Sequence, residues 1–337
     1  MFRCQQDIIN NNMATLFNIW IILLPLIVWQ GHYEVPKVFW LLCGGIAVLI
    51  FWILNFKKLN LNKRDRWFLL WIFVLIFSSY LGDDFKTSIL GGSYRHQGII
   101  FFISLWLVLK TKEFLADSKK RQLFKGIGIV VVIESILVIL GKKLGTMGEQ
   151  NAVSGFLAIG SSFVFNYLPK WLQPWPLISM PLIFSKSGFL ALIPYIIKKI
   201  KPLWIVMFVV LVFILKPIDT SSIFENRAVI WKNAFTAISQ RPILGFGAES
   251  QERVFDKVFY ESGFPLSNLM IDRAHNLFLD VLIWGGIIGL IVFLKFLYLS
   301  YGGIQDKYLK LAFWSFLIYA FFQPLSVAHW LLFILII

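Results

Sequence analysis

Long apolar runs recur along this chain from one end to the other, and they constrain its fold more than any other feature. About twelve can be distinguished, and most approach the ~20 residues that a helix needs to cross the apolar core of a bilayer. Because lipid offers the backbone no hydrogen-bond partner, each run is expected to form a helix. The sequence therefore predicts an all-α, polytopic integral membrane protein. The runs lie near residues 14–30, 35–56, 67–82, 97–111, 125–141, 150–168, 174–186, 188–198, 202–216, 274–300, 310–323 and 326–337.

The composition also indicates a place in the lipid bilayer. Hydrophobic residues make up 58% of the 337 residues and charged residues only 15%, whereas a soluble domain carries about 25% charged residues. The net charge of +14 would suggest a nucleic-acid partner in a soluble protein. In a membrane protein the same excess is expected from Lys and Arg in cytoplasmic loops, so nucleic acid is not predicted as a partner.

Basic residues set the expected orientation of the chain. They gather in three connections, near residues 57–66, 110–125 and 198–201. A path that alternates from a cytoplasmic N-terminus puts all three on the cytoplasmic side, as the positive-inside rule requires. The same path puts the long polar segment 217–273 outside. We therefore expect one multi-pass domain over residues 1–337 in the cytoplasmic (inner) membrane, with this segment as an extracytoplasmic loop.

The extracytoplasmic loop has a helical pattern of its own. Apolar residues recur at helical spacing over 228–238, which predicts a helix that lies on the membrane surface and buries its apolar face there. Pro242, Gly245 and Gly247 then predict a break. A second, more charged helix is expected over about 249–260.

A histidine stands where this loop meets the next apolar run. The stretch reads Arg273-Ala274-His275-Asn276, and the apolar run that follows contains one acid, Asp280. Histidine is the side chain most easily tuned to exchange protons near neutral pH. At the membrane edge it would meet a lipid-borne substrate and a water-borne substrate together, so His275 is predicted to carry the chemistry.

The spacing around this histidine resembles a signature of the O-antigen ligase family. His275 and Asn276 are followed by nine residues, Gly286, two residues and Gly289, and that family has a His followed by Asn, Ser or Gln before a similar Gly-x-x-Gly. Three further stretches are similar to elements of the family. They are Arg227 to Trp231 (Arg-x-x-x-Trp), Pro242 to Gly247 (Pro-x-x-Gly-x-Gly) and the glycine-rich Gly145 to Asn151, in which Glu149-Gln150-Asn151 replaces the usual Asn-Pro-Asn.

The resemblance implies a membrane-embedded glycosyltransferase that needs no metal and no cofactor. Such an enzyme takes a glycan from an undecaprenyl-pyrophosphate carrier and passes it to an acceptor hydroxyl on the outer side of the membrane. The acceptor is a lipid A core sugar, a growing glycan chain or a protein Ser or Thr, and the sequence leaves these alternatives open. The predicted partners are therefore the lipid bilayer, the lipid-linked donor and one of these acceptors.

Transfer of this kind needs a base to take the proton of the acceptor hydroxyl. His275 is the candidate, and a positioned base contributes about 10²–10⁴-fold in rate. Its place before a helix and beside Arg273 favours the neutral, proton-accepting imidazole. The simpler interpretation is an interfacial histidine that only anchors the end of the helix.

The departing pyrophosphate needs cations to hold it. The candidates for substrate binding are Arg227, Lys186, Arg95 and Arg273, together with Asn276 beside the histidine. Arginine offers a planar fork that matches phosphate oxygens, and Lys186 stands where the family commonly has an arginine, so it keeps the charge but loses the fork. The alternative for Lys186 and Arg95 is anchoring at the level of the lipid headgroups.

Several acidic residues allow more than one interpretation. Asp83 and Asp84 could form a metal pair, but they have no third acid nearby in the sequence and a solvated loop is favoured. Glu134 lies within an apolar run, where a carboxylate must pair or become protonated. Asp280 could orient the imidazole of His275.

Two other classes of function fit parts of the sequence. A transporter or flippase of a lipid-linked or anionic solute would use intramembrane charges such as Glu134 and Lys186. Against it, we find no repeat of two halves, and the candidate residues gather on one outer face. A membrane scaffold or sensor would use the outer loop as a partner surface and would not require His275.

Overall fold

The computed structural model describes residues 2–54, 60–183, 185–197, 227–261 and 271–337. These residues form helices and loops, with one isolated pair of bridging residues, Trp29 and His32. The prediction of an all-α fold is confirmed for this part of the chain. The ninth apolar run, 202–216, and parts of the loop 217–273 lie outside the described residues.

The helices follow the predicted apolar runs, and the first of them begins well before the run that predicted it. In chain order the elements are α1 (Phe2–Leu23), η1 (Leu24–Leu26), α2 (Glu34–Leu54), α3 (Lys63–Tyr80), α4 (Phe85–Leu90), α5 (Ile99–Phe114), α6 (Asp117–Ile139), α7 (Gln150–Tyr167), η2 (Lys170–Leu172), α8 (Pro174–Ile183), α9 (Lys186–Ala191), α10 (Ile193–Ile197), α12 (Arg227–Gln240), α13 (Gln251–Glu261), α14 (Leu277–Gly303), α15 (Lys307–Phe322) and α16 (Val327–Ile336). The short α4 is an element that the sequence did not predict.

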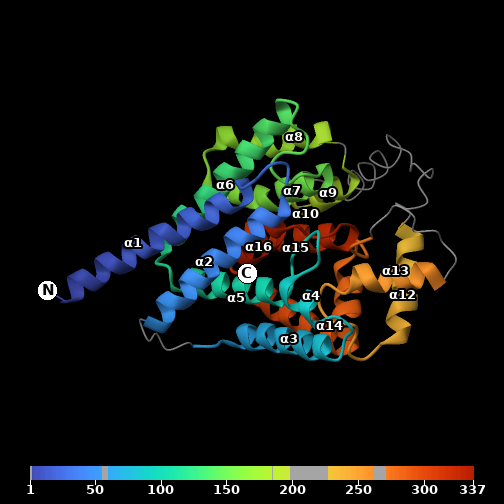
Figure 1. Ribbon diagram of the computed structural model, residues 1–337. Helices are drawn as coiled ribbons and strands as arrows, with labels where there is room; N and C mark the ends of the chain where they lie inside the picture. Colours follow the sequence, from blue (N-terminus) through green and yellow to red (C-terminus); the bar gives the residue numbers. More distant parts are fainter. Residues whose placement is uncertain (1, 55–59, 184, 198–226, 262–270) are drawn as a thin grey trace.

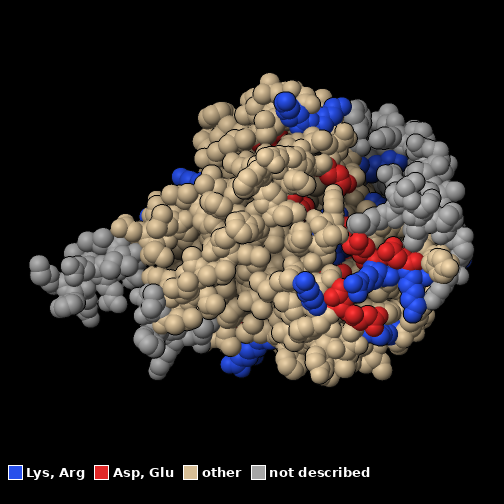
Figure 2. Space-filling model, viewed as in Figure 1, with Lys and Arg blue, Asp and Glu red and all other residues tan. Residues whose placement is uncertain are grey.

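Three of the described helices are long and apolar enough to cross a membrane, over Glu34–Ile53, Asp117–Ile139 and Leu277–Gly303. Figure 2 shows a visible face that is mostly uncharged, with acidic and basic side chains gathered over the end where Figure 1 places α12 and α13. Uncharged flanks are expected where lipid surrounds a protein, because charged side chains are costly there. A total of twelve spans stays a prediction.

Aromatic rings fill the seam between α3 and α14, which lie against each other over much of their length (Figure 1). The rings of Phe68 and Phe296 stack with their centroids 4.7 Å apart, and Trp71 lies 4.9 Å from both Phe293 and Phe102. Stacked and edge-to-face pairs of this kind contribute beyond the apolar area that they bury. The seam therefore fixes α14, the helix that carries the predicted histidine at its beginning.

A segment of the outer loop inserts into a break in α14. Gly286 has φ +60° and ψ −160° inside the helix, and the backbone N–H groups of Phe246 and Gly247 donate to the carbonyl oxygens of Ile283 and Trp284 at 2.8 and 2.9 Å. In the other direction, Ile287 N–H donates to Pro242 O at 2.9 Å. The carbonyl and amide groups that the break frees are thus bonded again, as buried backbone groups must be.

Glycine is required at this junction for steric reasons. A Cβ on Gly286 would lie 2.2 Å from Ile243 O, and a Cβ on Gly245 would lie 2.5 Å from Ile283 O. Both residues also have positive φ, which side chains disfavour. The Pro-x-x-Gly-x-Gly stretch and the first glycine after His275 are therefore two halves of one contact, which anchors the outer loop to α14.

The outer loop forms the two predicted helices, α12 and α13. The prediction that the apolar face of the first lies on the membrane surface is wrong, because Ile230, Ala234 and Ala237 are buried in a cluster with residues of α13 and α14. α12 packs against both of these helices at the end of the bundle (Figure 1). Protein contacts therefore cover Ile230, Ala234 and Ala237, whereas Phe235 is 58% exposed.

A cluster of buried charges lies where α3 begins and α5 ends. The ammonium group of Lys110 donates to Asp65 Oδ2 at 2.6 Å and also to the carboxylate of Glu113, which pairs with Arg64. Lys112 Nζ donates to the carbonyl oxygen of Ile334 at 2.9 Å, in the last turn of α16. Lys110 and Lys112 were predicted as loop charges, but they are 2% and 7% exposed because α3 and α16 pack over them.

Candidate active site

His275 lies in a constrained turn immediately before α14. The backbone of Ala274 is held from both sides, since its N–H donates to Asp280 Oδ1 at 2.8 Å and its carbonyl accepts from the indole of Trp231 at 3.0 Å. His275 itself has φ +54°, a left-handed conformation that is uncommon outside glycine. Trp231 comes from α12, so the Arg-x-x-x-Trp element of the outer loop fixes the turn that presents the histidine.

The side chain of Asn276 caps α14. Its Oδ1 accepts hydrogen bonds from Phe278 N–H at 2.9 Å and Leu279 N–H at 3.2 Å, and the residue is 4% exposed. Asn and Ser are the preferred residues at such a position because a short polar side chain satisfies N–H groups that the helix leaves open. The cap explains why an asparagine follows His275. The contact of Asn276 with substrate stays a prediction.

The imidazole of His275 is partly buried among positive charges. Burial lowers the pKa of His275 to about 3, and the charges of Arg227 and Arg95 act in the same direction. Asp272 and the side-chain amide of Gln323 oppose them and raise the pKa. The ring is therefore neutral at pH 7, the form that the sequence predicted, and its role as a base stays a prediction.

One ring nitrogen of this histidine has no partner within the described part of the chain. Nδ1 of His275 is buried and makes no hydrogen bond there. Buried polar atoms are rarely left in this state, and such an atom requires an explanation. A hydrogen bond from a ligand hydroxyl to Nδ1 would explain why the protein leaves this atom unbonded. A general base makes the same contact with the hydroxyl that it deprotonates.

Arg227 reaches the same place from the start of α12. Its guanidinium donates to Gln323 Oε1 at 3.4 Å, and Gln323 follows the last turn of α15. Gln323 thus lies between Arg227 and His275. The sequence prediction did not include Gln323, although a polar residue at the end of an apolar run was a signal that could have found it.

Arg273 lies next to the histidine turn but points into the protein. Its guanidinium donates to Gln251 Oε1 at 3.1 Å and to Glu249, and it lies 4.8 Å from the centroid of the Trp284 ring. With 2% of its surface exposed, it is enclosed by α13, α14 and the segment before α5. These contacts favour a role in holding the turn, and contact with pyrophosphate stays a prediction.

Arg95 approaches the histidine turn from the segment between α4 and α5. It forms an ion pair with Asp272, three residues before His275, and its guanidinium lies 5.4 Å from the centroid of the Tyr94 ring. Burial by itself would raise the pKa of Asp272, but the charges of Arg95 and Arg273 prevail and hold it below its usual value. The ion pair between Arg95 and Asp272 therefore joins the segment before α5 to the histidine turn.

Lys186 lies at the same end of the bundle. It is the first residue of α9, whose N-cap, Ser185, donates to Asn151 Oδ1 at 2.8 Å at the beginning of α7. The hydroxyl of Tyr319, four residues before Gln323, donates to Asn151 O at 3.0 Å. These contacts place Lys186 at the end of the bundle that carries Arg227 and His275.

The structure shows partners for the four acidic residues that the sequence left open. Asp83 pairs with Arg241 at 3.0 Å and Asp84 with Arg253 at 2.8 Å, which fits the favoured loop interpretation. Glu134 accepts from Thr146 N–H at 3.1 Å and from the hydroxyl of the same residue. Asp280 bonds the backbone of Ala274 and the Gln251 side chain, so it orients the histidine turn through its backbone.

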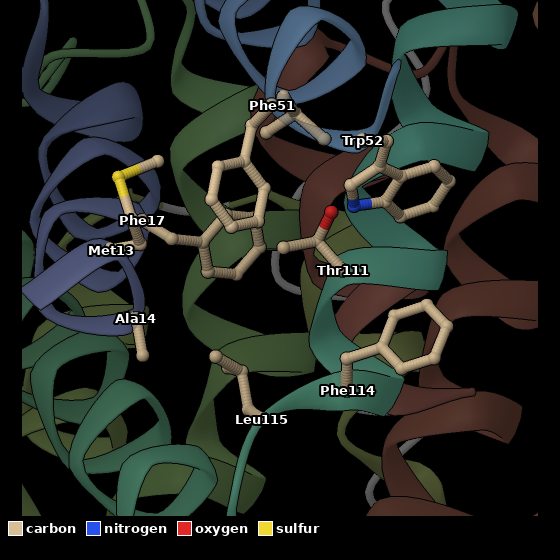
Figure 3. A pocket seen from close by; sticks show the side chains of 9 residues that line it. Met13, Ala14, Phe17, Phe51, Trp52, Thr111, Phe114 and Leu115 are labelled. Atoms are coloured by element: carbon tan, nitrogen blue, oxygen red, sulfur yellow. The ribbon is translucent and has the colours of Figure 1, made fainter. Parts of the chain in front are cut away.

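Two cavities differ in chemistry. One of about 180 Å³ lies between α1, α2 and α5, and Figure 3 shows it surrounded by side chains such as Phe17, Phe51 and Trp52. The other, of about 300 Å³, lies beside Arg95 and is lined by polar residues that include Glu34 and Glu149. Glu34, at the start of α2, was not among the predicted site residues.

The comparison with known proteins agrees with the residues at this site. The O-antigen ligase family matches residues 86–294, which is more than half of the chain and includes Arg95, Lys186, Arg227 and His275. The chain belongs to the O-antigen ligase family. The resemblance found in the sequence is thereby confirmed. The match ends within α14, after the break at Gly286.

Curated relatives of the chain are ligases and transferases of glycans by name. The chain is 26% identical over 267 residues to a Rickettsia conorii protein named as a putative polysaccharide ligase, covering 75% of this chain and 56% of that protein. It is 25% identical over 333 residues to the ComP-specific O-oligosaccharyltransferase of Acinetobacter baylyi, covering 78% of this chain and 58% of that protein. The chain thus spans little more than half the length of these relatives. No solved structure is significantly similar to it.

Proposed function

We propose that this member of the O-antigen ligase family transfers a glycan from undecaprenyl pyrophosphate to an acceptor hydroxyl at the outer face of the cytoplasmic membrane. The observation that carries the proposal is the neutral imidazole of His275, whose buried Nδ1 lacks a partner in the described residues and which lies beside Arg227. A base next to a cation is the arrangement that this transfer needs.

The step itself requires one proton transfer and one displacement. His275 takes the proton of the acceptor hydroxyl, and the acceptor oxygen forms a bond to the anomeric carbon of the donor glycan. The bond between that carbon and the pyrophosphate oxygen breaks, and its electron pair leaves with undecaprenyl pyrophosphate. Because the leaving group is anionic, cations stabilise the transition state in which it departs.

We assign the binding of pyrophosphate to Arg227, with Lys186 as a further cation at the same end of the bundle, whereas Arg95 is neutralised by its ion pair with Asp272. Arg227 is connected to the surroundings of the imidazole by its hydrogen bond to Gln323. Arg95 is connected to them by its ion pair with Asp272. Arg273 and Asn276 are positioning residues in this scheme, since their side chains hold the turn and cap α14. No step in the scheme requires a metal or a cofactor.

The orientation in the membrane is part of the proposal. We place the N-terminus in the cytoplasm, about twelve spans across the inner membrane and the loop 217–273 outside. The basic cluster of Arg64, Lys110 and Lys112 then faces the cytoplasm, in agreement with the positive-inside rule. The proposed acceptor is a lipid A core sugar, a growing glycan chain or a protein, and the name of the Acinetobacter baylyi relative supports the protein class.

The first test compares two histidines with the same backbone conformation. His275 and His96 have φ +54° and +52°, and asparagine tolerates this region, so His275→Asn and His96→Asn remove an imidazole with little added strain. We expect His275→Asn to lower glycan transfer by about 10²–10⁴-fold and His96→Asn to leave it unchanged. The measurement is surface-glycan mobility in the native host, with membrane protein levels matched.

The second test addresses the cations. Arg227→Ala is expected to weaken binding of the lipid-linked donor, whereas Arg253→Ala, which removes a surface arginine paired with Asp84, is expected to leave it unchanged. Equal donor affinity in the two variants would contradict the role of Arg227. Normal glycan transfer by His275→Asn would contradict the role of His275 as the base. Translocation of the donor by the protein without glycan transfer would indicate a flippase.

A further inference from the structure

The polar cavity beside Arg95 is built by four segments that are distant in the sequence. Tyr33 and Glu34 come from the start of α2, Tyr94 and Arg95 from the segment before α5, and Glu149 from the loop before α7. Pro324 and Ser326, between α15 and α16, complete the wall. At about 300 Å³ the cavity falls at the lower end of the range for small-ligand sites, roughly 300–1,000 Å³.

A carboxyl oxygen in the wall of this cavity lacks a hydrogen-bond partner. Glu34 is 9% exposed, and its Oε2 accepts from Val327 N–H at 2.9 Å. Its Oε1 is buried and unbonded within the described part of the chain. Leaving a buried acceptor unsatisfied is costly, so this atom marks a position where a ligand donor is expected.

Two tyrosine rings flank the same cavity. A Cβ on Gly148 would lie 2.4 Å from the ring of Tyr33, so only glycine lets this loop close against the ring. Tyr94 is 59% exposed, and Arg95 covers one side of it. Aromatic faces pack well against the apolar C–H faces of a sugar ring, while the hydroxyls of the sugar remain free to hydrogen bond.

Two lining residues, Arg95 and Pro324, link the cavity to the surroundings of the imidazole. Arg95 lines the cavity and pairs with Asp272 of the histidine turn, and Pro324 lines it directly after Gln323, which contacts Arg227. A ligand in the cavity would therefore lie close to the histidine turn. Since Asp272 already neutralises Arg95, while Glu34 and Glu149 add carboxyl groups, the cavity disfavours a phosphate.

We propose that this cavity binds a neutral sugar residue of the glycan and positions it beside His275, with Glu34 accepting a hydrogen bond from a sugar hydroxyl. The inference rests on the proposed function and adds to it the place where the saccharide binds. It predicts selectivity for uncharged sugars over acidic ones, because a carboxylate or phosphate on the ligand would meet Glu34 or Glu149.

The test measures sugar binding to the full chain in nanodiscs by saturation-transfer NMR, with methyl glycosides of glucose, N-acetylglucosamine and glucuronic acid as probes. We expect the neutral probes to bind more tightly than the glucuronide. Glu34→Gln keeps an oxygen for Val327 N–H but loses the carboxyl group, and should weaken neutral-sugar binding about tenfold to a hundredfold. The exposed Asp256→Asn on α13 is the matched control.

A second pair of variants guards against misfolding as the cause of a loss. Tyr94 and Tyr260 are both exposed, at 59% and 84%, so Tyr94→Ala and Tyr260→Ala should both fold, and only the first should lose sugar binding. Absence of binding by the neutral probes, tighter binding of the glucuronide, or equal binding by wild type and Glu34→Gln would overturn the inference.

The failure of this inference can be told apart from a failure of the proposed function. If His275→Asn abolishes transfer while Glu34→Gln transfers glycan normally, the catalytic proposal stands and the sugar site is wrong. If His275→Asn transfers glycan normally while Glu34→Gln loses sugar binding, the cavity binds sugar and the proposed base is wrong.

Discussion

Two buried groups of charges lie near opposite ends of α5, and they are built differently. Arg95 precedes the helix and Lys110 lies near its end, so the two groups are roughly 20 Å apart along its axis. Around Lys110, both oxygens of Asp65 accept hydrogen bonds and Lys112 caps the last turn of α16. Around Arg95, a ring nitrogen of His275 and an oxygen of Glu34 have no partner in the described residues.

The difference separates a structural use of charge from a functional one. Both groups require desolvation of ions, which opposite charges nearby offset. In the Lys110 group the carboxylates are satisfied by the protein, so the charges join α3, α5 and α16. In the Arg95 group Glu34 lines a polar cavity, and in the functions that we propose its unbonded oxygen and the ring nitrogen of His275 both contact a ligand. Burial of charge alone therefore does not identify the site.

The largest effect on stability is expected from the Lys110 group. Asp65→Ala removes one of the two carboxylates that pair with Lys110, 2% exposed, and leaves only Glu113, and breaking a buried pair typically costs about 3–5 kcal/mol. Transfer per folded molecule should not change. Denaturant unfolding in detergent measures the loss, and Asp117→Ala, whose carboxylate is solvent-exposed, is the control. A loss no greater than that of the control would contradict the comparison.

An intermediate effect is expected where the outer loop inserts into α14. Gly286→Ala puts a Cβ 2.2 Å from Ile243 O at a positive φ, and strain of this kind costs about 1–3 kcal/mol. The segment 242–247 should detach and become sensitive to protease. Gly302→Ala, later in the same helix and with open space around the new Cβ, should show neither change. Equal protease sensitivity of the two variants would mean that the insertion does not hold the loop.

A smaller effect on the free energy of unfolding is expected from the side chains that cap the beginnings of α14 and α15. Asn276 caps α14 and Asp306 caps α15 through the same two kinds of backbone bond, and replacing either by Ala should cost about 1 kcal/mol in unfolding free energy. Only Asn276→Ala should also lower glycan transfer, because it disturbs the histidine turn. Asn276→Ser should retain the cap and the transfer activity. If it instead transfers as poorly as Asn276→Ala, then Asn276 contacts substrate as the sequence predicted.

A separate effect, which appears only as the pH falls below neutral, is the pH dependence that His275 contributes. Its pKa is about 3 in the folded protein, below the ordinary value of 6.5, so the unfolded state binds the proton first as the pH falls. The stabilising contribution is therefore present above pH 6.5 and is lost as the pH falls toward 3. His275→Asn should show a smaller drop in thermal midpoint between pH 7 and pH 5 than wild type. An identical drop would indicate an imidazole that titrates normally.

The sequence predicted the helices and the family because both depend on local pattern. Most of the apolar runs within the described residues match observed helices, and the break between α12 and α13 falls at Pro242 and the following glycines, where the sequence placed it. Such features depend on backbone chemistry and on residues within a few turns of each other. The prediction failed where a residue contacts distant parts of the chain, as with the face of α12 and with Lys110.

Of the candidate site, the sequence by itself singled out His275, the arginines Arg95, Arg227 and Arg273, and the family to which the chain belongs. The tertiary structure decided which of these side chains face one another, because Arg95, Arg227 and His275 meet only through the packing of helices far apart in the chain. The tertiary structure also shows that Arg273 points into the protein and that Asn276 caps α14. Glu34 and Gln323 join the candidate site residues only through it. Hydrophobic periodicity specifies which residues are buried, but the contacts between helices determine which polar atoms are left for a ligand.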